Sequence, residues 1–375
     1  MRDMRRAAVR QSLLAGIILV AAGCAASHRA IGPDTGRIPD INAYPAMAND
    51  APPGASASAA AMASAIGRGV NFGNMLEAPT EGAWGLRVTD DFIDKATAAG
   101  FTAVRLPVRW SNHASADAPY TIDPLFLAHV DSIVDKLLAK GIVVVLNMHH
   151  YRQLDGDAPD PRDVAVDPRA VDVRFVMMWE QIATHFQGKG ARLLFEPYNE
   201  PHGRLTGEPW NVLAARTLGV IRRTNPTRVV VIGPTNWNAA SDLALLKLPN
   251  DANLIATIHD YNPFTFTHQG AGWVTPTPPT GVTCCSGAQV AEMTQPLDVA
   301  KSWSDVKHYP VYVGEFGSYS KADSASRIVF NRAMRSAMES RGMSWTYWEF
   351  AAGFGVYDPV ARAFRQALLD SLLGA

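Results

Sequence analysis

Eight short apolar runs recur between residue 67 and the C-terminus, and longer segments of helical periodicity separate them. The runs are rich in Val, Ile, Leu and aromatic residues and lack the polar alternation of a half-exposed strand. Such strands suit a parallel sheet that is buried on both faces. The predicted strands are 69–72, 103–108, 142–147, 192–195, 228–232, 254–258, 311–313 and 345–347.

The segments between these runs are predicted to be helices, because apolar residues recur at helical spacing and Asp, Ser or Pro often precedes them. They are 90–99, 123–140, 172–187, 209–224, 288–307, 324–341 and 359–373, and the fifth connection, 239–247, is short. Eight such units predict a single α/β domain, a (β/α)8 TIM barrel. The rival is a doubly wound open sheet, but no glycine-rich phosphate loop follows the first strand.

The first 65 residues differ in character from the rest. Residues 1–24 are predicted to be an export signal, since four arginines precede an apolar run that is too short to span a membrane. The run ends in Ala21-Ala22-Gly23-Cys24, which resembles a lipoprotein cleavage box. We therefore expect a lipidated Cys24 that anchors the protein outside the cytoplasm, at the outer membrane, periplasm or cell surface. Ordinary cleavage with secretion is the alternative.

Residues 25–65 are rich in Ala, Ser and Pro and show no apolar period, so they are predicted to form a flexible linker before the barrel of residues 66–375. Within the linker, 55–65 could form some helix, but we expect nothing to hold it against a core.

Charge and cysteine content exclude several classes of protein. With 34 basic and 35 acidic side chains, the chain has no electrostatic reason to bind nucleic acid. The only other cysteines, Cys284 and Cys285, exclude a disulfide framework and lack further ligands at metal-site spacing. Adjacent cysteines can form only a vicinal disulfide, and the sequence leaves their state open. We expect a monomer.

Polar side chains follow nearly every predicted strand. In a barrel these strand ends surround one mouth, where such folds place their active sites. The residues are Asn71, Asn74, Arg105, Arg109, Asn147, His149, His150, Asn199, Glu200, Asn236, Trp237, His259, Tyr261, Glu315, Trp348 and Glu349.

Two glutamates on non-adjacent strands, Glu200 and Glu315, form a candidate catalytic pair. Such a pair suits cleavage of a glycosidic bond, in which one carboxyl protonates the leaving oxygen while the other attacks or activates water. Glu196 lies within its strand and is expected to make interior hydrogen bonds. Glu349 follows Trp348 and is expected to bind substrate.

The histidines do not predict a metal site. His149 and His150 are adjacent, so on a strand they would point to opposite faces. No Asp, Glu or Cys cluster completes a site, and we expect neither a metal nor another cofactor. The residues expected to cluster and to bond sugar hydroxyls or the carboxylates are His150, His259, His268, Arg105 and Tyr261.

From residue 67 to residue 374 the sequence resembles glycoside hydrolase family 5, the retaining endoglucanase group of barrel glycosidases. Seven motifs in order carry the resemblance: GRGVNFGNMLEAPTEGAWG (67–85), RLPVRW (105–110), NMHHY (147–151), NEPHG (199–203), HDYNPFTFTHQGAGW (259–273), VGEFG (313–317) and WEFAAGFGVYD (348–358). They look most similar to a bacterial branch that includes broad-specificity cellulases acting also on mannan.

The resemblance implies roles for the matching residues. Glu200 would be the general acid/base and Glu315 the nucleophile, with Asn199 bonded to the 2-hydroxyl of the sugar. Arg105 and Tyr261 would orient Glu315 and keep it ionised.

Around this centre, His150 and His259 would complete the hydrogen-bond shell, and Trp348 would stack under the reacting sugar. The other residues expected to bind substrate are Asn74, Glu77, His149, His268, Trp273 and Glu349. Asp260, where an aromatic or apolar residue is expected, and the proline-rich Cys-Cys loop depart from the family pattern, which leaves the sugar specificity open.

The predicted function is a retaining endo-β-1,4-glucanase that acts on β-linked polysaccharide through a covalent glycosyl-enzyme. The alternatives on the same scaffold are a β-mannanase, a glucomannanase or a mixed-linkage β-glucanase. A barrel that only binds sugar is disfavoured because both glutamates are present, and a surface adhesin would need neither.

Overall fold

The computed structural model describes residues 37–374. The predicted export signal, Cys24 and the first part of the linker lie outside these residues. No helix between residues 37 and 374 combines the length and apolar character needed to cross a membrane.

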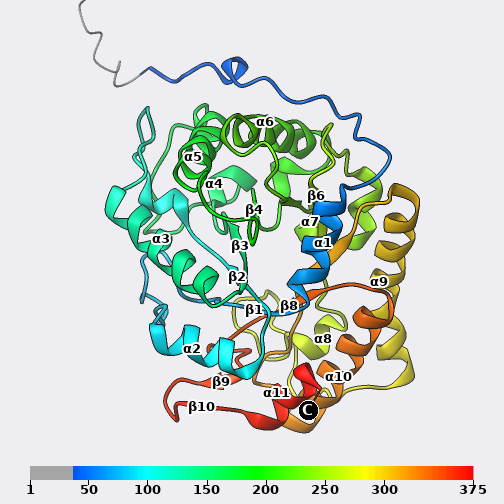
Figure 1. The fold of residues 1–375 in the computed structure, drawn as a ribbon. Coiled ribbons are helices and arrows are strands. Elements are labelled where there is room, and N and C mark those ends of the chain that lie inside the picture. The colour runs from blue at the N-terminus through cyan, green and yellow to red at the C-terminus, as the bar shows by residue number, and fades with distance from the viewer. Residues whose placement is uncertain (1–36, 375) are drawn as a thin grey trace, which may run out of the picture. The chain divides into compact units, whose positions relative to one another are not determined.

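Eight parallel strands close into a barrel in the order of the chain, which confirms the predicted fold class (Figure 1). The strands are β1 Arg68–Asn71, β2 Ala103–Leu106, β3 Val143–Asn147, β4 Leu193–Glu196, β5 Val230–Ile232, β6 Leu254–His259, β7 Val311–Glu315 and β8 Trp345–Tyr347. Each predicted strand is present, with ends that differ from the prediction by at most two residues.

Helices follow the strands and surround the barrel. They are α2 Asp90–Ala99, α3 Pro124–Ala139, α5 Val171–His185, α6 Glu208–Thr224, α9 Gly287–Lys307, α10 Ser324–Ser340 and α11 Gln366–Leu373, with the 3₁₀ helix η4 Ala240–Leu245 as the short fifth connection. Shorter turns lie in the connecting loops: η2 Trp110–His113, α4 Arg152–Asp155, η3 Gly203–Leu205, α7 Thr235–Asn238 and α8 Phe264–Thr267.

Side-chain alternation along the strands builds two separate cores. Val143 and Val145 of β3 pack inside the barrel with Leu194 of β4, whereas Val144 and Leu146 belong to the core between strands and helices. Because the side-chain period of a strand is two residues, Glu196 shares the inner face with Leu194. The sequence of β4 therefore forces a carboxylate into the barrel at its carboxyl end.

Residues 37–65 correct the prediction of a flexible linker. Helix α1 Ala57–Ile66 packs its face of Ala59, Ala63 and Ile66 against side chains of the barrel interior. Ser56 caps the helix by accepting the Ala59 N–H. The signal for this helix was weak because small alanines, which suit the narrow barrel floor, resemble linker composition.

The segment before α1, which includes the 3₁₀ helix η1 Ile41–Ala43, also contacts the barrel domain. Arg216 of α6 donates to the carbonyls of Ile41 and Tyr44 at 2.9 and 2.6 Å. The Met47 N–H donates to the Ala215 carbonyl, and Ala48 accepts from the Asn250 N–H. Residues 37–56 are therefore part of the folded domain.

The C-terminal region also differs from the prediction of one helix over 359–373. A short antiparallel pair, β9 Tyr357–Asp358 and β10 Ala363–Phe364, precedes α11. The Asp358 carboxylate accepts the N–H groups of Val360 and Ala361, which turns the chain before a helix can begin.

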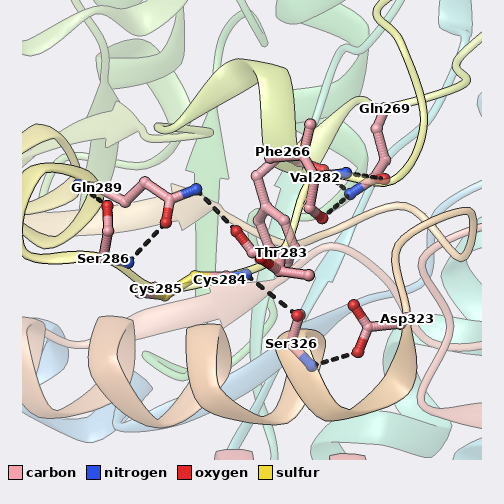
Figure 2. Close-up of a disulfide and its surroundings, with 10 residues drawn as sticks. All are labelled: Phe266, Gln269, Val282, Thr283, Cys284, Cys285, Ser286, Gln289, Asp323 and Ser326. Atoms are coloured by element: carbon pink, nitrogen blue, oxygen red, sulfur yellow. Dashed lines mark hydrogen bonds between the residues drawn. A yellow bond between two sulfur atoms is a disulfide. The ribbon is translucent and has the colours of Figure 1, made fainter.

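Cys284 and Cys285 are joined in a vicinal disulfide in the loop before α9 (Figure 2). The Cys284 N–H donates to the Ser326 hydroxyl of α10, and Ser286 forms a capping box with Gln289 at the start of α9. The buried side chain of Gln269 bonds the backbone of Val282 in the same loop. The bonds of Gln269 tie the loop to the chain segment that carries His268, and the bond of Cys284 ties it to α10.

Candidate active site

A cleft of about 1320 Å³ opens at the carboxyl ends of the strands. Every residue predicted to be catalytic or to bind substrate lines it, except Arg105 and Glu349. The predicted residues that line the cleft are Asn74, Glu77, His149, His150, Asn199, Glu200, His259, Tyr261, His268, Trp273, Glu315 and Trp348.

Arg105 lies beneath the cleft and organises its floor. It is fully buried, and its guanidinium makes a two-point ion pair with Glu196 at 2.7 and 2.8 Å. Its remaining donors reach Glu315, the amide oxygen of Asn71 and the amide oxygen of Asn199. The prediction that Glu196 makes interior hydrogen bonds is confirmed.

Glu315 receives one hydrogen bond on each carboxylate oxygen. Arg105 Nη1 donates to Oε1 at 2.7 Å, and the Tyr261 hydroxyl donates to Oε2 at 2.9 Å. Both donors favour the ionised form and fix the direction of the carboxylate. Burial nevertheless has the largest effect on the pKa of Glu315 and raises it, against the lowering effects of His259 and Arg105. Arg105 opposes this rise but does not outweigh it.

Glu200 has a different environment. Its side chain is 24% exposed, and its one side-chain partner is His259, whose Nδ1 lies 2.6 Å from Oε1. Burial raises the pKa of Glu200 to about 7. The carboxyl can therefore hold a proton near neutral pH, as a general acid must.

The hydrogen bonds of His259 determine which oxygen of Glu200 is free. Asn238 donates its amide N–H to the Asn199 carbonyl, and the same nitrogen lies 3.3 Å from His259 Nε2. Nε2 thus accepts, so Nδ1 carries the hydrogen and donates to Glu200 Oε1. Burial lowers the pKa of His259 to about 4, which keeps the ring neutral. The Oε2 atom of Glu200 is left to carry the acid proton.

The two glutamates lie close together. One carboxylate oxygen of each and one ring nitrogen of His259 are all within 4.8 Å of one another. Retaining glycosidases hold their carboxyl groups about 5–5.5 Å apart, whereas inverting enzymes need about 6.5–9.5 Å to admit a water. The spacing matches the retaining class.

Glu200, His259 and Glu315 also lie close enough together to hold a metal ion. Within residues 37–374, they are the one group of such side chains with this spacing. Glu315 already accepts from Arg105 and Tyr261, and His259 has partners on both nitrogens. Glycosidic cleavage accounts for the same geometry without a metal, and the absence of a cofactor stays a prediction.

Asn199 presents its amide nitrogen to the cleft. Its Oδ1 accepts from Arg105, so its Nδ2 hydrogens remain available to a ligand. The Asn199 N–H donates to the Met148 carbonyl, which fixes the loop after β4 against the loop after β3.

The positions of the adjacent histidines His149 and His150 differ from the prediction that they point to opposite faces of a strand. Both follow the end of β3 and line the cleft, so the opposite-face argument for strand residues does not apply to them. His149 stacks on Trp348 with the ring centres 5.5 Å apart, and its Nδ1 lies 3.3 Å from the amide nitrogen of Asn147. His150 packs edge-on against His149 and Trp84.

Glu349 lies outside the cleft lining, contrary to its predicted place among the residues that bind substrate. Its carboxylate is fully buried behind the cleft and accepts the N–H groups of Ala351, Ala352 and Phe354. It therefore shapes the loop after β8. Glu77 does line the cleft, but its oxygens accept the N–H groups of Asn74 and Met75, and burial raises its pKa to about 8.

Exposed aromatic rings extend the cleft beyond the catalytic pair. Trp84, Trp237, Phe264 and Trp273 line it and are 43–60% exposed. Only Trp273 was predicted to bind substrate, although Trp237 stood at a predicted strand end. Flat exposed rings suit the apolar faces of sugars, and their loops follow β1, β5 and β6.

Asp260, the departure from the family pattern, lies outside the cleft wall and is 1% exposed. Its Oδ1 accepts two hydrogen bonds from Asn262, and burial raises its pKa to about 7. Its effect on the cleft is therefore indirect, through the turn that follows Tyr261.

Comparison with known proteins identifies the family. The family model "Cellulase (glycosyl hydrolase family 5)" matches residues 64–353. Endoglucanase H of Acetivibrio thermocellus is 37% identical over 314 residues, which cover 82% of this chain but only 33% of that relative.

Two groups of solved structures are also similar over nearly their whole length. A hyperthermophilic endo-β-1,4-glucanase in complex with substrate is 40% identical, with a TM-score of 0.80 over 84% of this chain and 99% of the other. Thermotoga maritima Cel5A in complex with cellobiose and with mannotriose is 41% and 40% identical in the two structures, each with a TM-score of 0.79 and the same coverage. The motifs, the barrel, the paired glutamates and these matches together lead to one conclusion: this chain belongs to the cellulase family, glycosyl hydrolase family 5.

Proposed function

We propose that this protein is a retaining endo-β-1,4-glucanase that hydrolyses internal bonds of β-glucan. The observation that carries the proposal is the close pair of Glu200 and Glu315 in a cleft with exposed aromatic rings on several sides. An open, aromatic-lined cleft suits a polymer that continues on both sides of the cleaved bond.

In the first step, Glu200 gives its proton to the glycosidic oxygen while Glu315 attacks the anomeric carbon. The bond to the leaving sugar breaks, and a covalent glycosyl-Glu315 forms. Arg105 and Tyr261 hold Glu315 in place for this attack. The free amide N–H of Asn199 is available to the 2-hydroxyl of the reacting sugar, and Trp348 provides a flat surface at the cleft floor.

In the second step, the deprotonated Glu200 takes a proton from water, and the hydroxide displaces Glu315 from the anomeric carbon. Two inversions restore the β configuration, and both carboxyl groups return to their starting states. The neutral His259 keeps its hydrogen bond to Glu200 Oε1 throughout.

A second candidate is action on mannan or glucomannan. It is supported by the mannotriose complex of a relative that is 40% identical to this chain. Mixed-linkage β-glucan is a third substrate of the same class.

Reducing-sugar release from carboxymethyl cellulose, barley glucan, glucomannan, mannan and xylan tests these candidates. We expect the highest rates on the two glucans and none on xylan. Equal or faster cleavage of mannan would favour the second candidate. No release from any of the five polymers would refute the proposal of a glycanase.

We further propose that the enzyme is exported and anchored through a lipid on Cys24, on the strength of the sequence of residues 1–24 alone. Expression in a bacterial host should place the protein in the membrane fraction. Cys24→Ala should shift it to the soluble fraction with unchanged specific activity. If the variant partitions like the original protein, Cys24 is not the anchor.

A further inference from the structure

His202 belongs to the NEPHG motif but has no part in the proposed reaction. It lies two residues beyond Glu200, and its Nδ1 is 2.7 Å from the Glu200 carbonyl oxygen. A carbonyl only accepts, so Nδ1 carries a hydrogen and donates. Asp157 lies 3.4 Å from Nε2, and Asp155 lies 3.5 Å from Nδ1. The imidazole is thus held by its own backbone motif and by the loop after β3.

Trp237 lies flat on this imidazole. The two ring centres are 4.6 Å apart and the planes differ by 19°. Trp237 is nevertheless 54% exposed, so His202 supports part of the indole while the rest of it remains open to the cleft. The neighbouring rings Phe264 and His268 form a separate stack, with their centres 4.2 Å apart.

The backbone around Trp237 is unusual and tied to the acid/base. Asn236, Trp237 and Asn238 all have φ near +57°, a region that is uncommon for bulky residues. The Trp237 N–H points to the Pro201 carbonyl at 3.4 Å, and the Asn238 side chain donates to the Asn199 carbonyl. The strained turn is therefore held against the segment from Asn199 to His202.

These contacts place the indole on one side of the reaction centre. Trp237 and His202 contact the Glu200 segment, whereas Glu315 and Trp348 come from β7 and the loop after β8. Glu200 protonates the leaving oxygen, so a ring fixed beside it lies where the leaving part of the polymer would bind.

We propose that His202 is a positioning residue for the leaving-group side of the cleft: it supports the Trp237 indole from below so that a departing sugar can stack on the exposed part. This inference rests on the proposed function. The His202 ring bonds to neither reacting carboxyl, and its lowering effect on the pKa of Glu200 is smaller than the effects of burial and of Arg105. We therefore expect its main role in binding of the leaving sugar and not in the bond-breaking step.

Two substrates separate binding from chemistry. Cellotetraose places sugars on both sides of the cleaved bond, whereas β-cellobiosyl fluoride has only a fluoride as leaving group and leaves the Trp237 side empty. We expect His202→Ala to raise KM for cellotetraose about tenfold, as loss of one aromatic stack would, with less than a twofold change in kcat on cellotetraose and in kcat/KM on the fluoride. His202→Phe keeps a flat ring and should restore most of the cellotetraose KM.

Trp237→Ala should show the same pattern as His202→Ala, and the double variant should be no worse than Trp237→Ala alone, because both substitutions remove one platform. His185→Ala is the matched control: His185 is a surface histidine of α5 that pairs with Asp131 of α3, and its loss should leave the kinetics on both substrates unchanged. The inference is overturned if His202→Ala slows the fluoride as much as cellotetraose, or if the two substitutions multiply. If the unaltered protein cleaves neither substrate, the proposed function itself fails.

Discussion

Glu315→Ala should lower kcat/KM on β-glucan by at least about 10⁴-fold, the scale of loss seen when a covalent nucleophile is removed. Glu196, the carboxylate below it, cannot replace it at the anomeric carbon, because Arg105 holds it in a two-point ion pair. We expect the melting temperature near pH 7 to stay equal or to rise.

The stability expectation follows from the sign of the pKa shift. Burial raises the pKa of Glu315 in the folded protein, so ionising this carboxyl costs folding free energy at pH values above its unfolded pKa. Alanine removes that cost, and Arg105 keeps Glu196, Asn71 and Asn199 as partners. Activity and stability should therefore change independently.

A small anion can test the role of the missing group. The space left by Glu315→Ala should admit azide, which would attack β-cellobiosyl fluoride from the same face and yield the α-glycosyl azide. Glu208→Gln, an exposed glutamate on α6 paired with Lys247, is the control and should keep full activity. A Glu315→Ala enzyme that retains turnover without azide would contradict the nucleophile assignment.

The sequence predicted the barrel because strand and helix periods alternate eight times, and that pattern depends on local residue types. It predicted Glu200 and Glu315 for a related reason: the carboxyl ends of barrel strands converge, so residues next to strand ends must meet. Glu196 could be separated from Glu200 because Glu196 lies within its strand, whereas Glu200 follows the strand end.

The wrong predictions concern residues whose position depends on contacts with distant parts of the chain and not on a local sequence pattern. Glu349 adjoins a strand end like the true cleft residues, and only the loop that folds back onto its carboxylate removes it from the cleft. Helix α1 looked like linker because alanines can either stay exposed or fill a narrow floor. The support of Trp237 by His202 joins the loops after β4 and β5, and a single sequence carries no signal for such a contact.

Glu200→Ala should affect substrates according to their leaving groups. On β-glucan, where the leaving sugar needs a proton, we expect kcat to fall about 10²–10⁴-fold. On β-cellobiosyl fluoride the first step needs less assistance, so the glycosyl-Glu315 intermediate should form in a rapid burst and then hydrolyse slowly for want of a base. Mass spectrometry of the quenched burst should find one cellobiosyl group on the peptide that contains Glu315.

Azide and pH complete the test of Glu200. Azide should speed the second step of Glu200→Ala and give the β-glycosyl azide, the opposite anomer to that from Glu315→Ala, because it attacks the intermediate from the water's side. The pKa of Glu200 is raised to about 7 and the acid must be protonated, so activity of the unaltered enzyme on β-glucan should fall as pH rises through about 7. Glu200→Ala should lose this alkaline limb. If both variants yield the same azide anomer, or the limb persists in Glu200→Ala, the two glutamates do not have the separate roles that their surroundings indicate.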